Sequence, residues 1–332
     1  MSRSHNPNFP ADLNIHPSSS LFNTHRQDES LLETYNHAAQ EKAIKGFGIA
    51  GRIWEAAYAI RAYLDPPPGR VYDPPFPTTV RLDKLQLTMI ELGSGAGIVG
   101  STLAPALAEE DLFVLTDLAE VCPLLESNVR STASDVQMLH VRPLAWGNAE
   151  DANAIARELL CGRTLTHILC SDLVYFPELL APLLRSLIQL SSVSFSGGID
   201  NPVNIIISYK IRSLAKETPF WSAFGLWFTY EPLLERQRSS DDGKETPIPW
   251  RRFGADVEDS IFIFIARRRP ESFDWTVPED DHDLLSGMGA RGSLQPKGDD
   301  QFESLLFMLL QDEDGQESDT DRDGDKPVTE TV

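Results

Sequence analysis

Short apolar stretches alternate with amphipathic ones along the middle of the chain. Seven stretches are apolar and partly β-branched, as buried strands of a parallel sheet are, and they cover residues 87–92, 112–116, 137–141, 165–170, 203–208, 226–230 and 261–266. Helical patterns follow the first five, at residues 98–104, 122–130, 152–160, 178–190 and 213–224. Because no helical pattern separates the last two strands, we expect an α/β fold with a seven-stranded, mostly parallel sheet, one antiparallel strand and helices on both faces.

Two helical segments are expected before the first strand. The first covers residues 28–40 and ends ahead of the glycines at 46–51. The second, over residues 52–64, has apolar side chains at i, i+4, i+7 and i+11, which are Ile53, Ala57, Ile60 and Leu64. Prolines directly after Asp65 end this helix, because proline lacks an N–H and disfavours a helical residue before it. We expect residues 66–82 to form a surface loop.

The two ends of the chain differ from its middle in composition. Residues 1–20 are rich in Ser, Asn and Pro without periodicity, so we expect them to be disordered, with the folded domain over residues 21–269. Residues 271–332 hold 18 Asp and Glu but 4 Lys and Arg, a net charge of −14 out of the chain's −21, which leaves −7 for the rest. The domain thus has no basic excess that would favour a nucleic acid as its main ligand. We expect residues 270–332 to form an acidic, largely disordered tail.

One apolar segment interrupts this acidic tail. Within residues 302–310, a helical face at i, i+3, i+4 and i+7 is formed by Phe302, Leu305, Leu306 and Leu309. A helix this short is marginal in water by itself. We therefore expect it to form by docking on the domain or on a partner.

The sequence has no pattern typical of a membrane protein or of a cysteine-based metal site. No apolar run approaches the roughly 18 residues that span a bilayer, and the first residues have no hydrophobic signal core, so we expect an intracellular protein, cytoplasmic or also nuclear, without a membrane partner. The three cysteines, Cys122, Cys161 and Cys170, lack C-x-x-C spacing. Neither a disulfide framework nor a metal site is expected from them.

Residues 88–101 are the centre of the candidate chemistry. Their apolar strand stops at Gly93, Gly95 and Gly97, and a helical pattern starts directly afterwards. Glycine lets the backbone take positive φ and lets a ligand approach without meeting a Cβ, while the new helix offers unpaired N–H groups. The turn predicts a polar ligand at the carboxyl end of the strand.

Two cofactor classes use such a turn. Residues 95–100 match the dinucleotide pattern G-x-G-x-x-G, and Asp117 ends the next strand 17 residues later, where a ribose-binding acid is expected. Read from Glu91, the same stretch is E-L-G-S-G-A-G, which resembles motif I of class I, seven-β-strand, S-adenosylmethionine-dependent methyltransferases. In that family the acid and the first glycines hold the amino-acid part of S-adenosyl-L-methionine. A glycine turn without a ligand is the remaining interpretation.

Ligands of an open parallel sheet lie beyond the carboxyl ends of its strands, so residues there are the main candidates. These are Gly93, Asp117, Trp146, Asp172 and Tyr209. The Asp117 carboxylate can accept hydrogen bonds from both hydroxyls of a ribose, and the indole of Trp146 offers a flat surface to an adenine ring. The structural alternatives are a helix N-cap for either aspartate and a place in the core for the tryptophan.

Three further motifs narrow the resemblance. They are G-R-I-W-E-A-A at residues 51–57, L-A-W-G at 144–147 and D-x-x-Y at 172–175. Together with the glycine turn, their order along the chain resembles the protein-lysine branch of these enzymes, the methyltransferase-like 21 type that modifies non-histone proteins. The resemblance covers residues 28–268 and implies a Rossmann-like sheet. It implies that the cofactor is bound by Trp54, Glu91, Gly93, Ser94, Gly95, Asp117, Trp146 and Ser171, and that the acceptor amine is faced by Asp172 and Tyr175.

The same resemblance implies a protein substrate, such as a translation factor, a chaperone or an AAA ATPase. The chain departs from common members in its loop at 66–82, in Arg52 and in the insert at 231–260. This insert follows the sixth strand, whose carboxyl end lies on the site's side of the sheet, so we expect it to overhang the acceptor mouth.

The residue types suit methyl transfer to an amine. Displacement at a sulfonium needs little acid–base help, so the protein must chiefly align a neutral amine. Lysine in water has a pKa of about 10.4, and an apolar channel favours its neutral form. Asp172 can attract the incoming ammonium and orient the amine, while Tyr175 and Phe176 can stabilise the methylated cation by cation–π contact.

Three other classes stay open. A small-molecule amine N-methyltransferase of the nicotinamide type uses a similar sheet, and an NAD-dependent oxidoreductase uses a similar glycine turn. A non-catalytic adaptor would keep the fold and bind partners through it and through the acidic tail.

Overall fold

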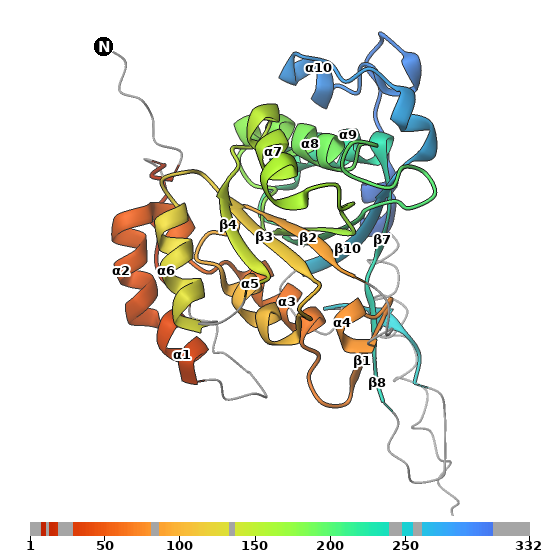
Figure 1. The fold of residues 1–332 in the computed structure, drawn as a ribbon. Helices are drawn as coiled ribbons and strands as arrows, with labels where there is room; N and C mark the ends of the chain where they lie inside the picture. Colours follow the sequence, from red (N-terminus) through yellow and green to blue (C-terminus); the bar gives the residue numbers. More distant parts are fainter. Residues whose placement is uncertain are drawn as a thin grey trace, which may run out of the picture.

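The computed structural model describes residues 8–10, 13–18, 29–80, 86–132, 137–238, 248–254 and 261–307. A central sheet lies between two layers of helices (Figure 1). Within these ranges no helix has the length and apolarity needed to cross a membrane.

The central sheet has seven strands in the order β4-β3-β2-β5-β6-β10-β7. Their bounds are Thr88–Leu92 for β2, Leu112–Asp117 for β3, Leu139–Pro143 for β4, His167–Ser171 for β5, Asn204–Lys210 for β6, Phe228–Pro232 for β7 and Ile261–Arg268 for β10. Strand β10 is antiparallel to both neighbours, whereas β2 to β6 pair in parallel. The predicted Rossmann-like sheet is confirmed, and each strand lies within two residues of its expected bounds.

The order of the strands places the site. The chain proceeds outward from β2 through β3 to β4, then returns to the other side of β2 with β5 and β6. Such a switch point leaves a crevice at the carboxyl ends of the two central strands, because the connections on either side run in opposite directions. Here these strands are β2 and β5.

Helices cover both faces (Figure 1). One face carries α1 Glu29–Tyr35, α2 His37–Phe47, α3 Glu55–Leu64, α5 Ile98–Leu103 and α6 Cys122–Thr132. The other carries α7 Ala149–Ile155, α8 Pro177–Leu190, α9 Leu214–Trp227 and α10 Asp281–Leu285. Each face has its own cluster of buried apolar side chains.

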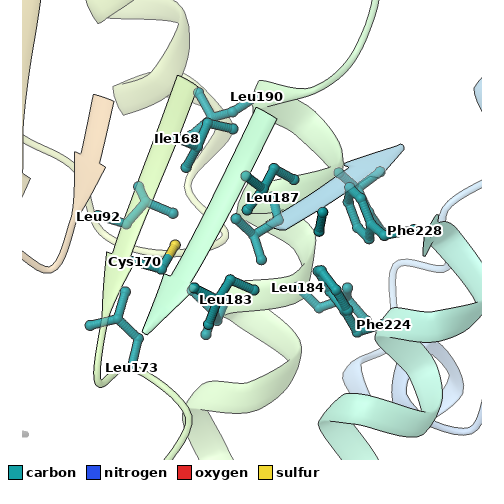
Figure 2. Packing of buried hydrophobic residues seen from close by; sticks show 14 of the residues in the cluster. Leu92, Ile168, Cys170, Leu173, Leu183, Leu184, Leu187, Leu190, Phe224 and Phe228 are labelled. Atoms are coloured by element: carbon teal, nitrogen blue, oxygen red, sulfur yellow. The ribbon is translucent and has the colours of Figure 1, made fainter. Parts of the chain in front are cut away.

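Helix α8 shows why these segments pack as they do. Its leucines repeat at helical spacing and are buried in one cluster with Leu92, Ile168 and Cys170 of the sheet, and Figure 2 shows Leu184 beside Phe224 of α9. Burial of one leucine stabilises a fold by about 1.5–3 kcal/mol, so this stripe fixes the helix on the sheet. Its first residue, Pro177, lies at the rim of the crevice.

The segment between α3 and β2 is not the plain loop that its prolines predict. It contains β1 Arg70–Asp73 and α4 Pro77–Val80. Strand β1 pairs with β8 Leu234–Gln237, which pairs with β9 Arg251–Arg252 in a separate three-stranded sheet. Tyr72 anchors this sheet, with its ring centroid 5.8 Å from that of Tyr63.

This small sheet also corrects the expected position of the insert at 231–260. Its described residues, 231–238 and 248–254, belong to the end of β7 or lie in or beside β8 and β9, and none of them lines the pocket described below. Pairing with Arg70–Asp73 places the described part of the insert in the small sheet and not over the acceptor mouth. Residues 239–247 and 255–260 lie outside the described part.

The N-terminal region is more structured than its composition predicts. The Ile49 N–H donates to the Asn8 carbonyl at 2.9 Å, and the Ser18 N–H donates to Oε1 of Gln40 at 3.1 Å. The single helix expected at 28–40 is two helices, because Asn36 accepts from the Ala39 N–H and begins α2. The described pieces of residues 1–20 therefore lie against the domain.

The fold continues past residue 269, where the sequence predicts the domain to end. Residues 270–307 include α10 and a helical turn at 301–307. Phe302 is 0% exposed and stacks on Trp221 with ring centroids 4.9 Å apart. This contact adds Phe302 to the core beneath α9, while residues 308–332 lie outside the described part.

Candidate active site

A cavity of about 480 Å³ opens at the carboxyl ends of β2, β3 and β5. All ten of the predicted site residues line it: Trp54, Glu91, Gly93, Ser94, Gly95, Asp117, Trp146, Ser171, Asp172 and Tyr175. Their roles stay predictions, but the sequence pattern has brought together one site from five separate segments.

The glycine turn forms the floor of the cavity. Gly93, Gly95 and Gly97 all have positive φ, at 58°, 52° and 85°. A Cβ on Gly93 would lie 2.7 Å from the Leu173 side chain and 2.9 Å from that of Trp146. Only glycine fits there, because the backbone passes directly beneath both side chains.

Ser94 and Asp117 tie the turn to the neighbouring strand. The Ser94 N–H donates to the Thr116 carbonyl at 2.9 Å, and Oδ2 of Asp117 accepts from the Gly95 N–H at 2.8 Å. Oδ1 accepts from the Leu118 N–H at 2.7 Å. Each carboxylate oxygen has a second acceptor position, so Asp117 can hold the turn and still accept bonds from a ligand. Burial raises its pKa to about 6.

Glu91 is a buried acidic residue of the pocket. Its side chain is buried, and burial raises its pKa to about 8. Its Oε2 has no hydrogen-bond partner among the described residues, and the same holds for the Ser171 hydroxyl. A buried acceptor without a partner is costly, so these two atoms indicate a place where a ligand supplies the donors.

Aromatic rings form the walls. The Trp54 indole N–H donates to the Ile49 carbonyl at 3.0 Å, which fixes the ring. The rings of Trp146 and Tyr175 meet edge to face with their centroids 6.5 Å apart, and the centroids of Tyr175 and Phe176 are 4.7 Å apart. The cavity therefore has two aromatic sides, one from the segment before α3 and one from the loops after β4 and β5.

Asp172 lies at the end of β5 in a strained conformation. Its φ is 63°, which a residue with a Cβ rarely adopts, and its N–H donates to the Ser208 carbonyl at 2.8 Å. Both carboxylate oxygens accept from Arg212, Oδ1 at 2.6 Å and Oδ2 at 2.5 Å. Burial raises the pKa of Asp172, and the guanidinium opposes that shift.

The sequence prediction did not include Arg212 or its second partner, Glu55. Nη2 of Arg212 lies 3.3 Å from Oε2 of Glu55, whose Oε1 pairs with Arg52 at 2.5 Å. Glu55 stands in the G-R-I-W-E-A-A motif, but its pairing with a residue 157 positions away leaves no local signal. Two arginines and two carboxylates thus form one connected group at the pocket.

Tyr209, the fifth strand-end candidate, does not reach the cavity. Its side chain is 0% exposed and packs on the face of β6 that α8 and α9 cover. Its hydroxyl donates to Oε2 of Glu217 at 2.5 Å. Oε1 of Glu217 accepts from the Ser213 N–H at 2.9 Å. Tyr209 therefore acts indirectly, by holding the loop that carries Arg212.

A family model described as lysine methyltransferase matches residues 36–224, more than half of the chain. This span includes the glycine turn, both aspartates and the aromatic walls. The chain belongs to this lysine methyltransferase family, which confirms the resemblance in its motifs.

Two relatives agree with the family. The protein-lysine N-methyltransferase EFM6 of Saccharomyces cerevisiae is 28% identical over 175 residues, which cover 51% of this chain and 66% of that protein. The protein N-lysine methyltransferase METTL21A of Xenopus tropicalis is 27% identical over 150 residues, covering 45% and 58%. The chain thus spans less than two thirds of the length of either relative.

Similarity to solved structures is weak. An O-methyltransferase from Bacillus cereus in complex with SAH has a TM-score of 0.39 and 12% identity, over 74% of this chain and 93% of that chain. The fold assignment depends on the strand order described above.

Proposed function

We propose that the protein is an S-adenosyl-L-methionine-dependent protein-lysine N-methyltransferase acting on a non-histone protein. The observation that carries this proposal is the pair of Glu91 and Asp117 at the glycine turn, one carboxylate with an oxygen lacking a partner among the described residues and one with acceptor positions to spare. Membership of the lysine methyltransferase family supports the reaction and the acceptor.

The residues fit this cofactor. We assign the ammonium end of its amino-acid part to Glu91, because a buried carboxylate oxygen without a partner in the described structure requires a donor or a cation. The ribose hydroxyls fall to Asp117 and the adenine to Trp146, with Trp54, Ser94 and Ser171 completing the wall. When bound, the cofactor supplies an electrophilic methyl group.

The chain's own task is to present a neutral amine. The aromatic walls around Tyr175 and Phe176 exclude water, which favours the uncharged form of a lysine side chain. Burial raises the pKa of Tyr175 above its ordinary value, so its phenol stays protonated and can donate a hydrogen bond. Asp172 is assigned to the acceptor, where it orients the amine.

One experiment tests the reaction and its product together. The purified protein is incubated with S-adenosyl-L-methionine carrying a labelled methyl group and a cell extract, and the labelled protein is hydrolysed to amino acids. We expect the label in methylated lysine of a non-histone protein. Label in a small molecule that passes a dialysis membrane would support a nicotinamide-type enzyme and contradict the proposal.

Calorimetric titration distinguishes a methyltransferase from an oxidoreductase and from a non-catalytic adaptor. We expect S-adenosylhomocysteine to bind and NAD to give no heat of binding. Binding of NAD alone would support an oxidoreductase, and binding of neither would support an adaptor. The cytoplasmic or nuclear location, the type of substrate protein and a partner docked on the acidic tail remain parts of the proposal.

A further inference from the structure

Asp172 is already occupied by a cation of the chain itself. Arg212 donates from both terminal nitrogens to both carboxylate oxygens, at 2.6 and 2.5 Å. This two-bond arrangement is the strongest form of a carboxylate–arginine pair. The guanidinium neutralises the negative charge that would otherwise draw an acceptor's ammonium to Asp172.

The pair has a buried and an exposed member. The side chain of Asp172 is 1% exposed, whereas that of Arg212 is 29% exposed. The guanidinium is therefore the more accessible member of the pair, although both residues line the cavity. An amine that approaches Asp172 meets a positive charge beside the carboxylate, and the full negative charge of Asp172 becomes available only if Arg212 moves.

A second carboxylate, that of Glu55, contacts the same guanidinium and is shared with Arg52. Oε2 of Glu55 is 3.3 Å from Nη2 of Arg212, and the guanidinium carbon lies 5.3 Å from the centroid of the Trp54 ring. An arginine that leaves Asp172 keeps a counter-ion and an aromatic surface on this side. The cost of the exchange is thus lower than the cost of leaving a charge unpaired.

The backbone beneath Arg212 is held in place, so only its side chain has to move. The Arg212 N–H donates to Oε2 of Glu217 at 3.3 Å, and the Ser213 N–H donates to Oε1 at 2.9 Å. Glu217 is itself buried and accepts from the Tyr209 hydroxyl. The arginine side chain can therefore change its partner while its backbone stays bound to Glu217.

We propose that Arg212 is a specificity-determining residue, which reserves Asp172 for acceptors that bind tightly enough elsewhere to displace its guanidinium onto Glu55. A whole protein has binding energy from remote contacts to drive this exchange, whereas a single amino acid does not. Arg212 therefore discriminates against free lysine and short amines. The proposal rests on the proposed lysine methyltransferase function.

The test compares two acceptors with the variant Arg212→Ala. One is N-α-acetyl-lysine methylamide, and the other is the protein in a cell extract that the wild type labels. The ratio of the initial rates on the small and the large acceptor should rise by about tenfold or more in Arg212→Ala, as loss of a charge-assisted pair predicts. Arg212→Lys keeps the charge but cannot donate two parallel bonds, so its ratio should lie between those of the wild type and Arg212→Ala.

Controls separate this effect from damage to the fold. Each variant is tested for affinity for S-adenosylhomocysteine and for its melting temperature. Arg142→Gln serves as a control that also loses one arginine: Arg142 does not line the pocket, and its Nε lies 3.6 Å from Oε2 of Glu158. If Arg212→Ala does not fold, Arg212→Lys carries the test. An unchanged ratio, or equal losses on both acceptors, overturns the proposal and makes Arg212 a positioning residue. Absence of methyl transfer and of S-adenosylhomocysteine binding in the wild type contradicts the proposed function instead.

Discussion

The two sides of the pocket satisfy their polar groups in opposite ways. On the cofactor side, an oxygen of Glu91 and the Ser171 hydroxyl have no partner within the described residues. On the acceptor side, Asp172 and Glu55 are paired with Arg212 and Arg52. The difference indicates that the cofactor side is prepared for its ligand in advance, whereas the acceptor side must exchange one of its own contacts for the substrate.

Removing the carboxylate of Asp172 is the strongest way to separate the two sides. We expect Asp172→Asn to lower methyl transfer to the labelled protein by about 100-fold or more, the size expected for a group that orients or deprotonates an acceptor. The rate is measured at saturating S-adenosyl-L-methionine. A variant that retains more than a third of the wild-type rate would remove Asp172 from the acceptor side.

Phe302 links the C-terminal segment to helix α9, which follows the loop that carries Arg212. Phe302→Ala should lower the free energy of unfolding by about 3–5 kcal/mol, because it removes a fully buried ring that stacks on Trp221. The measurement is urea unfolding, with Phe307→Ala as the matched control, since that ring is 62% exposed. Equal stability of both variants would show that the segment does not belong to the core.

Asp117→Ala tests the cofactor side alone. Loss of hydrogen bonds to a charged group should cost about 1–3 kcal/mol, which raises KM for S-adenosyl-L-methionine by about 5- to 150-fold. The rate at saturating cofactor should change little, because the interaction is the same in the ground state and the transition state. A fall in the saturated rate with an unchanged KM would assign Asp117 to the acceptor.

Glu91→Gln tests through pH the carboxyl group of Glu91, whose Oε2 has no partner among the described residues. Burial raises the pKa of Glu91 to about 8, so between pH about 4.5 and 8 the folded protein keeps a proton that the unfolded chain releases. The wild type without cofactor should thus lose stability as pH rises through this window, and the variant should not. Its melting temperature should exceed that of the wild type by about 10 °C at pH 8.5 and by less at pH 5, since each pKa unit corresponds to about 1.4 kcal/mol and each kcal/mol to about 2–4 °C. An advantage of equal size at both values would show that Glu91 does not titrate in this range.

Much of the cofactor side is predictable because it consists of strand ends. Glu91 and Asp117 lie at the carboxyl ends of apolar strands and Gly93 follows one directly, and parallel strands bring such ends to one edge. The acceptor side depends on a contact between Asp172 and a residue 40 positions later, which lies in a loop set by Glu217. No local pattern encodes that contact.

The small sheet could not be predicted either, because it also depends on contacts between distant parts of the sequence. Its strands have at most four residues, and β1 pairs with β8 across 160 positions or more of sequence. Pairing at such a distance has no signature in either segment, and the prolines around β1 favour a loop. For the segment around Phe302, the sequence did indicate the apolar face of a helix, but it did not indicate that α9 is the surface it packs on.

Calorimetric titration of S-adenosylhomocysteine into the wild type, Asp117→Ala and Asp172→Asn tests the division of the pocket most directly. We expect the dissociation constant to rise at least fivefold in Asp117→Ala and to stay within threefold of the wild-type value in Asp172→Asn. Equal weakening in both variants, or weakening in Asp172→Asn alone, would contradict a pocket divided into a cofactor side and an acceptor side.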